Sequence, residues 1–152
     1  MPEDTVVEAA PETPTAEPWS PTLLAILCNW CSYAGANLAG ASRMQYDPAV
    51  RVVRVPCSGR VDPLMIYKAF ERAVDGVLVG GCHLGDCHYS EGNYACQGRM
   101  ALVKALLSAA GIEPERFRLE WISASEGQIF RDVIDEMSAK LRELGPLKLG
   151  NG

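Results

Sequence analysis

Four short strand-like runs alternate with helical segments along this chain, and this alternation limits the possible folds more than any other feature. The runs cover residues 22–27, 50–55, 76–79 and 117–122. The run at 22–27 is apolar on both faces, which is typical of parallel strands buried between helices. We therefore predict an α/β fold in which a four-stranded parallel sheet is flanked by helices, of the Rossmann or flavodoxin-like type, with right-handed crossovers.

Helical periodicity fills the intervals between these runs. The predicted helices cover residues 32–44, 63–74 and 95–110, with a fourth from the region of Ser123 to Leu144. Asp62 and Pro63 have the residue types favoured at an N-cap and at a first helical position. Gly111 should end the third helix. Ser123 and Glu126 have the spacing of a capping box at the start of the fourth.

Five of the six cysteines lie at predicted strand ends or in the loops directly after them. These are Cys28, Cys31, Cys57, Cys82 and Cys87. Because parallel α/β sheets bind ligands beyond the carboxyl ends of their strands, we expect these five thiols to converge there. Cys96 lies at the start of a predicted helix, and we interpret it as a small buried hydrophobic residue.

The cysteine spacing leaves three kinds of chemistry open. Cys28 and Cys31 are separated by two residues, and Cys82 and Cys87 by four. Both gaps suit a tetrahedral zinc site, whereas a 2Fe-2S cluster accepts such mixed spacing more readily. A thiol-disulfide oxidoreductase could use the Cys28-x-x-Cys31 motif, but this interpretation leaves the other three cysteines unexplained.

The glycine-rich loop around Cys82 and Cys87 contains further candidate residues. Gly81 and Gly85 could adopt unusual backbone dihedrals and direct N–H groups at sulfide. His83 and His88 are candidate metal ligands, although we favour a role as hydrogen-bond donors to cluster sulfurs or a purely local one. The remaining candidates are two arginines that could balance the charge of a thiolate-ligated cluster, Arg60 beside Cys57 and Arg43.

Several functional classes have no support in the sequence. There is no G-x-G-x-x-G motif, no P-loop and no basic patch, so neither a nucleotide nor a nucleic acid is predicted as a partner. No run approaches the roughly 18 apolar residues of a membrane span, and residues 1–20 lack the features of a secretory signal. We therefore expect a cytoplasmic protein, in which clustered cysteines indicate metal or redox chemistry rather than disulfides.

The first 20 residues differ in composition from the rest of the chain. They contain five acidic residues and no Lys or Arg, and they account for the whole net charge of -5. Their proline and charge content predicts a disordered acidic tail, with Trp19 as an anchor if the tail instead lies on a partner subunit. Residues 21–147 are predicted to form one α/β iron-sulfur domain, and residues 148–152 a flexible C-terminus.

A specific resemblance joins most of these motifs. Residues 28–40, 42–46, 57–63, 80–89, 92–94 and 119–127 closely resemble the methyl-viologen-reducing hydrogenase delta-subunit family. The segments at 28–31 and 80–89 read Cys-Asn-Trp-Cys and Gly-Gly-Cys-His-Leu-Gly-Asp-Cys-His-Tyr. The likeness covers about residues 22–146, so only the acidic tail and the last few residues fall outside it. Cys96 is not part of the family's cysteine pattern.

The resemblance implies a function and a set of ligands. It implies an electron-transfer subunit with a 2Fe-2S cluster and no substrate chemistry of its own. Its partners would be a hydrogenase or formate dehydrogenase module and a heterodisulfide reductase-type, flavin-based electron-bifurcating complex. Of the five cysteines carried over, Cys57, Cys82 and Cys87 are the firmest ligands, with Cys28 or Cys31 as the fourth. The alternative from a different class is a zinc-stabilised interaction module.

Overall fold

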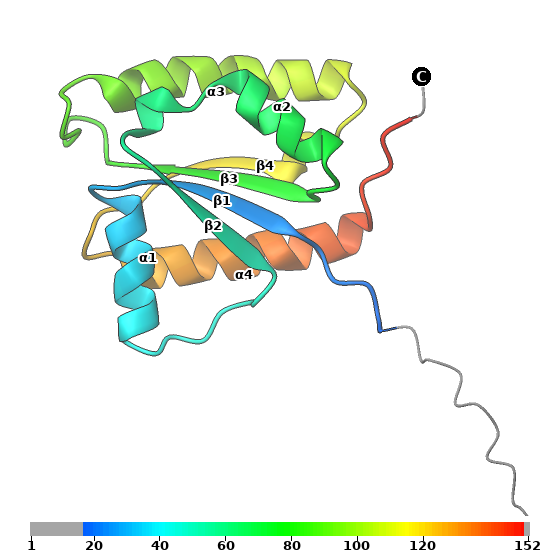
Figure 1. Cartoon of the computed structure of the whole chain (residues 1–152), viewed down its shortest axis with the longest axis horizontal. Helices are drawn as coiled ribbons and strands as arrows, with labels where there is room; N and C mark the ends of the chain where they lie inside the picture. The colour runs from blue at the N-terminus through cyan, green and yellow to red at the C-terminus, as the bar shows by residue number, and fades with distance from the viewer. Residues whose placement is uncertain (1–16, 151–152) are drawn as a thin grey trace, which may run out of the picture.

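The computed structural model describes residues 17–150 (Figure 1). Most of the predicted acidic tail (residues 1–16) and the last two residues of the predicted flexible C-terminus lie outside the described residues. Residues 17–20 are exposed and have no regular secondary structure, and the Trp19 side chain is 42% exposed. Between residues 17 and 150, no helix combines the length and the apolar character that crossing a membrane requires.

A single parallel sheet forms the centre of the molecule, which confirms the predicted α/β fold. Its strands are β1 (Leu23–Cys28), β2 (Val50–Val55), β3 (Gly76–Gly81) and β4 (Phe117–Trp121). They are hydrogen-bonded in the order β2-β1-β3-β4. The central strand β3 is buried along its whole length, whereas β2 lies at an edge and exposes four of its six residues. This difference explains why the central runs are the most uniformly apolar.

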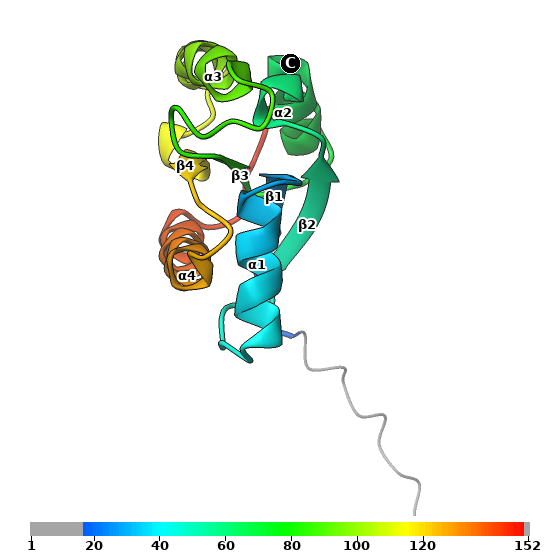
Figure 2. The ribbon, with the colours of Figure 1, turned by 90° about the vertical axis from the view of Figure 1, so that its left-hand side faces the viewer.

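Helices cover both faces of the sheet. They are α1 (Ser32–Ala41), α2 (Pro63–Glu71), α3 (Gly92–Ala109) and α4 (Gly127–Leu144). Helices α1 and α4 lie on one face, and α2 and α3 lie on the other (Figures 1 and 2). Each layer has its own apolar core. Leu27, Leu78, Phe130 and Ile134 belong to the core on the α1 and α4 side, and Ile26, Val79, Phe70 and Met100 to the core on the α2 and α3 side.

Local signals place some helix boundaries correctly and others only in part. Asp62 is the N-cap of α2, and its Oδ1 accepts the Leu64 N–H at 2.7 Å. The predicted capping box of α4 forms only one of its two bonds: Glu126 Oε2 accepts the Ser123 N–H at 2.7 Å. The Ser123 hydroxyl pairs with the Ser125 hydroxyl instead. Ser123 therefore stands in the loop before α4, whose N-cap is Glu126 and whose first residue is Gly127.

Other boundaries differ by a few residues for identifiable reasons. Helix α1 ends at Ala41 rather than at residue 44, because Arg43 has a φ of 55°, which no right-handed helix accommodates. Helix α2 ends at Glu71 rather than at residue 74, and Ala73 just after it likewise has a positive φ, of 62°. Helix α3 begins at Gly92, three residues before the predicted start at Ala95. The extra first turn of α3 lies beside the cysteines.

Two buried charged side chains hold the segments at the amino-terminal ends of the strands together. The Asp75 carboxylate accepts the backbone N–H groups of Thr22 at 2.8 Å and Leu147 at 3.0 Å. The Arg116 guanidinium donates to the Asp75 carbonyl at 3.2 Å and to the Glu113 carboxylate at 2.7 Å. These contacts join the starts of β1 and β3 to the segment after α4. The cysteines lie at the opposite, carboxyl ends of the strands.

Candidate metal centre

The strand order creates a crevice at the carboxyl ends of β1 and β3. The chain passes from β1 outward to β2 and from β3 outward to β4, so the sheet grows in opposite directions on either side of these two strands. Such a switch point is where open α/β sheets bind their ligands. Cys28 is the last residue of β1, and Cys82 follows β3 directly. The fold therefore brings two of the predicted cysteines to this crevice.

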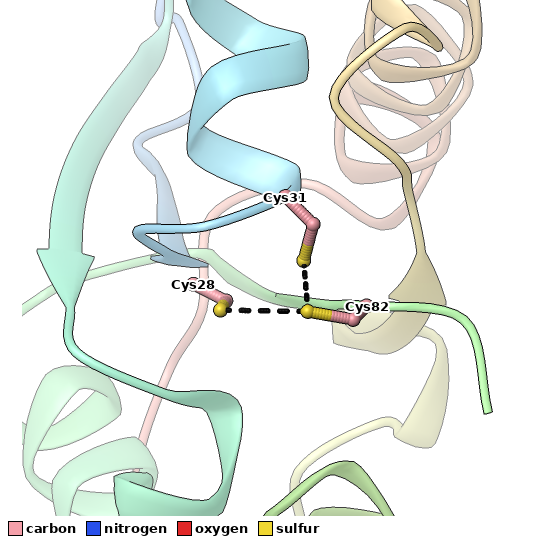
Figure 3. A group of neighbouring side chains, drawn as sticks. All are labelled: Cys28, Cys31 and Cys82. Carbon is pink, nitrogen blue, oxygen red and sulfur yellow. Dashed lines mark hydrogen bonds between the residues drawn. The ribbon is translucent and has the colours of Figure 1, made fainter. Parts of the chain in front are cut away.

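Three buried cysteines form the first group at this site. The sulfur atoms of Cys28, Cys31 and Cys82 all lie within 4.8 Å of one another. Figure 3 shows the three side chains pointing toward one another from β1, from the start of α1 and from the end of β3. The Sγ–Sγ distances are 3.8 Å for Cys28 and Cys82 and 2.6 Å for Cys31 and Cys82.

Cys57 and Cys87 form a second pair, with their sulfur atoms 3.8 Å apart. Cys57 is the N-cap of a 3₁₀ turn, η1 (Ser58–Arg60), and its sulfur accepts the Gly59 N–H at 3.4 Å. Both sulfurs lie against Gly92, the first residue of α3. A Cβ at position 92 would overlap the Cys57 sulfur and would come within 3.2 Å of the Cys87 sulfur. Only glycine leaves room for this pair of thiols.

The thiols of the first group share their protons unequally. The hydrogen bond from Cys31 lowers the pKa of Cys28 to about 5, against the effect of burial. The backbone N–H groups of Trp30 and Ser58 also act to lower it. Hydrogen bonding to Cys28, together with burial, raises the pKa of Cys31 well above its usual range. Burial also raises the pKa of Cys82. A bound metal ion would take the place of the thiol protons, because thiols bind metal ions as thiolates.

The second pair is also divided between a raised and a lowered pKa. Burial raises the pKa of Cys57. Burial has the same tendency at Cys87, but the backbone N–H groups of Tyr89, Asn93 and Gly92 outweigh it, and the pKa of Cys87 is lowered. Gly92 and Asn93 are the first two residues of α3, and the N-cap residue Glu91 makes no capping hydrogen bond with its side chain. The unpaired N–H groups and the dipole of this helix therefore favour a thiolate at Cys87.

Two fully buried polar side chains hold the cysteine segments in place, and sequence reasoning gave neither of them a role. Ser32 Oγ accepts the Cys28 N–H at 2.8 Å and donates to the Gly80 carbonyl at 2.8 Å. Asn93 Nδ2 donates to the carbonyls of Cys82 at 3.0 Å and His83 at 2.7 Å. The only sequence signal was their position, since Ser32 directly follows Cys31 and Asn93 lies in the Gly92-Asn-Tyr94 segment.

The two histidines direct their rings at other partners. His83 Nε2 lies 2.6 Å from Glu126 Oε2. The His88 ring stacks on Trp30 with a centroid distance of 3.8 Å and an interplanar angle of 13°. Within residues 17–150, neither imidazole is hydrogen-bonded to a cysteine sulfur. His88 instead contributes its backbone N–H, which acts to lower the pKa of Cys82.

The other candidate residues differ in how close they lie to the thiols. Arg60 is exposed at the end of the 3₁₀ turn that begins after Cys57, and in the described part of the chain it forms no ion pair. Arg43 follows the end of α1 that is remote from Cys31. Cys96 is fully buried in α3, where burial raises its pKa to about 11. This burial agrees with the interpretation of Cys96 as a core residue.

The two glycines have different conformations. Gly85 has a φ of 93° in the exposed turn between Cys82 and Cys87, as expected for a backbone that reverses direction. Gly81 has the ordinary extended conformation of β3, so the unusual dihedral expected there is absent. Its lack of a side chain serves packing instead, because a Cβ would lie 2.7 Å from the Trp121 ring.

The donor set fits a thiolate-ligated metal group. Two sulfurs at about 2.3 Å from one tetrahedral metal ion lie about 3.8 Å apart. This spacing matches both the Cys28–Cys82 and the Cys57–Cys87 distances of 3.8 Å. Backbone N–H groups at each pair would stabilise the negative charge that thiolates and sulfide bring. Cys31 is the fifth thiol, and it lies in the same compact group as Cys28 and Cys82.

Comparisons with known proteins give a consistent result. The family model for the methyl-viologen-reducing hydrogenase delta subunit matches residues 23–145. An F420-non-reducing hydrogenase iron-sulfur subunit from Archaeoglobus profundus is 56% identical over 133 residues, which is 88% of this chain and 97% of that protein. The vhc iron-sulfur subunit of an F420-non-reducing hydrogenase from Methanococcus voltae is 49% identical over 134 residues, 88% of this chain and 93% of that protein.

A third relative carries the same region within a much longer chain. It belongs to the ferredoxin:CoB-CoM heterodisulfide reductase of Methanosarcina mazei, and it is 44% identical over 127 residues. The match covers 84% of this chain but only 16% of that protein. The family match spans the whole sheet and all five cysteines of the site. The chain therefore belongs to the methyl-viologen-reducing hydrogenase delta subunit family.

Proposed function

We propose that this chain is an electron-transfer subunit that holds a 2Fe-2S cluster. In this role it passes electrons between a hydrogenase or formate dehydrogenase module and a heterodisulfide reductase-type, flavin-based electron-bifurcating complex. The observation that carries the proposal is the pair of 3.8 Å sulfur contacts, Cys28–Cys82 at the switch point of the sheet and Cys57–Cys87 against the start of α3. Two thiol pairs are what a cluster with two iron ions requires.

The names of the relatives support both ends of this relay. Those that match over most of their length are iron-sulfur subunits of hydrogenases. In the Methanosarcina mazei relative, the matching region is part of a heterodisulfide reductase chain. A region that occurs both as a separate hydrogenase polypeptide and within a heterodisulfide reductase chain is well suited to join the two enzymes.

We further propose Cys28 as the fourth ligand. Its sulfur lies 3.8 Å from that of Cys82, the spacing of two thiolates on one tetrahedral metal ion. The proposed ligands are then Cys28, Cys82, Cys57 and Cys87. Cys31 then remains a thiol beside the cluster, at the N-cap of α1.

The residues around the thiols supply what an electron relay needs. When bound, the cluster accepts and releases single electrons. The chain excludes water from Cys28 and Cys82, which are 1% and 3% exposed. The N–H groups of Trp30, Ser58 and Gly92 lie where they would stabilise thiolate charge. Burial and hydrogen bonding to sulfur are the means by which a protein sets the reduction potential of such a cluster.

One observation favours a zinc-stabilised interaction module as the second candidate. The compact group of Cys28, Cys31 and Cys82 supplies three thiols within 4.8 Å, three-quarters of a structural zinc site. This alternative leaves the Cys57–Cys87 pair without a role.

Metal and sulfide analysis of the full chain, purified without oxygen, distinguishes the two candidates. We expect a coloured protein with about two iron and two sulfide ions per chain, and an electron paramagnetic resonance signal after reduction. Rapid oxidation of the reduced chain by a heterodisulfide reductase complex would test the relay itself. A colourless protein with stoichiometric zinc and no such signal would refute the proposal.

A thiol-disulfide oxidoreductase makes a different prediction from either metal site. In that case Cys28→Ser would abolish disulfide exchange while Cys82→Ser would not. Loss of metal in both variants, without measurable disulfide exchange in the unmodified chain, would exclude this third activity.

A further inference from the structure

We propose that Asn93 is a positioning residue that fixes the distance between the two cysteine pairs and thereby tunes the cluster. The proposal rests on the proposed function, since it concerns the site that would hold the cluster. Asn93 is the second residue of α3, and its side chain is fully buried. It contacts the backbone at Cys82, and the residue before it, Gly92, lies against the sulfurs of Cys57 and Cys87.

The first point of contact is the backbone that carries Cys82. Both hydrogens of the Asn93 carboxamide are used, since Nδ2 donates to the Cys82 carbonyl at 3.0 Å and to the His83 carbonyl at 2.7 Å. Oδ1 accepts the Tyr94 N–H at 3.0 Å. The two carbonyl groups can only accept hydrogen bonds, so the amide nitrogen must face them. The orientation of the side chain is therefore determined by the loop it holds.

The second point of contact is made by Gly92, the residue before Asn93. A Cβ at this position would overlap the Cys57 sulfur and would come within 3.2 Å of the Cys87 sulfur. The side chain of Asn93 thus holds the backbone of a ligand of the first pair, and the first turn of α3, to which Asn93 belongs, lies against the second pair.

The turn between the two cysteines cannot fix their separation by itself. Leu84, Gly85 and Asp86 are all exposed, and Gly85 has a φ of 93°. The turn contains one backbone hydrogen bond, from the Asp86 N–H to the His83 carbonyl at 2.9 Å. A buried helix is a firmer support than an exposed turn. The hydrogen bonds of Asn93 attach the loop to α3, and this attachment would fix the separation of Cys82 and Cys87.

Loss of the carboxamide would leave the Cys82 carbonyl without a donor and the His83 carbonyl with only the Asp86 N–H. Buried polar groups without a partner are unstable, so the segment at Cys82 would move toward solvent to find water. Groups that orient metal ligands typically change metal affinity by 10–100-fold when they are removed. We expect the cluster to become labile and its environment to become more polar, while the apolar core of α3 stays intact.

The test compares Asn93→Leu with the unmodified chain. Leucine has a similar size but carries neither a donor nor a charge. We expect iron release to an anaerobic chelator to become about tenfold faster, with a shifted midpoint potential and altered g values for the remaining cluster. Asn37→Leu is the matched control, because Asn37 is exposed on α1, and its iron release and spectrum should equal those of the unmodified chain.

A second variant covers the case in which Asn93→Leu does not fold. Asn93→Asp keeps the size and the Oδ1 acceptor but presents a carboxylate oxygen to the two carbonyls, so it should also release iron faster. Folding of each variant is checked by far-UV circular dichroism. Unchanged iron release and g values in a folded variant would overturn the role of Asn93 alone. An unmodified chain without any iron-sulfur signal would instead refute the proposed function.

Discussion

The sulfur atoms of Cys28 and Cys82 lie 3.8 Å apart, although 54 residues separate them in the chain. The contact exists because β1 and β3 are neighbours in the sheet, with Leu27 paired to Gly80 in register. The two cysteines therefore lie side by side at the carboxyl ends of these strands. Cys31 reaches the same place from the start of α1, and this makes the roles of Cys28 and Cys31 experimentally separable.

Serine substitutions should distinguish these two cysteines. We expect Cys28→Ser to lose most of its iron, because Cys28 has the spacing of a ligand pair with Cys82, whereas Cys31→Ser should keep its iron and an electron paramagnetic resonance signal close to that of the unmodified chain. Cys96→Ser is the control and should leave both unchanged. The opposite result, with iron kept in Cys28→Ser and lost in Cys31→Ser, would reverse the assignment.

Gly92→Ala should disrupt the second cysteine pair without unfolding α3. A methyl group at position 92 would overlap the Cys57 sulfur. We expect clearly reduced iron content with an unchanged helix signal, because alanine is a better helix former than glycine. Gly98→Ala in the same helix is a matched control, since nothing lies within 4 Å of its added Cβ. It should stabilise the chain by about 0.5–1 kcal/mol. Full iron content in Gly92→Ala would show that the pair tolerates displacement.

Asp75→Ala should reduce stability without changing the cluster. The substitution removes the acceptor of two backbone N–H groups, those of Thr22 and Leu147, in a buried position. We expect a loss of about 2–3 kcal/mol, which corresponds to a fall of roughly 10 °C in the thermal midpoint. Glu71→Ala, at the exposed end of α2, should change the midpoint little. An equal effect of both variants would argue against a structural role for the buried carboxylate.

The ion pair between Glu113 and Arg116 should make stability depend on pH in the acid range. The hydrogen bond from Arg116 holds the pKa of Glu113 below its ordinary value of 4.5. A carboxyl whose pKa is lowered by folding stabilises the folded state at pH values above its ordinary pKa. This contribution is lost as the pH falls through the lowered pKa. Glu113→Gln should therefore be less stable than the unmodified chain at pH 7, with a difference that shrinks from about pH 5 to about pH 3.

Thermal midpoints of the two proteins, followed by circular dichroism across this pH range, provide the measurement. Both proteins share any acid lability of the cluster, so the difference between them reports on Glu113. A difference that is constant with pH would mean that the ion pair does not contribute.

The fold was predictable because buried strands and amphipathic helices are encoded by neighbouring residues. The four predicted runs all proved to be strands, and β1 and β3 extend slightly further, to Cys28 and Gly81. Errors arose where distant groups decide a boundary. The first turn of α3 lies against Cys57 and Cys87, and the hydroxyl of Ser123 pairs with that of Ser125. No local pattern contains those contacts.

The placement of the cysteines beyond the strand ends was predictable, and the side chains that support them were much less so. Positions after apolar runs indicated Cys28, Cys57 and Cys82, because parallel strands end at one edge. The part played by Asn93 depends on carbonyl groups 10 and 11 residues away, and that of His88 depends on Trp30 in another loop. Such roles follow from the path of the chain in space.

The amino-acid pattern alone thus specifies a parallel α/β domain and five thiols near one edge of its sheet. The tertiary structure decides how those thiols group, as Cys28 and Cys31 with Cys82, and Cys57 with Cys87. The physical reason is the strand order β2-β1-β3-β4. Hydrogen bonding between distant strands and the packing of α3 on the cysteine loop set the sulfur distances, and neither is a property of any short segment.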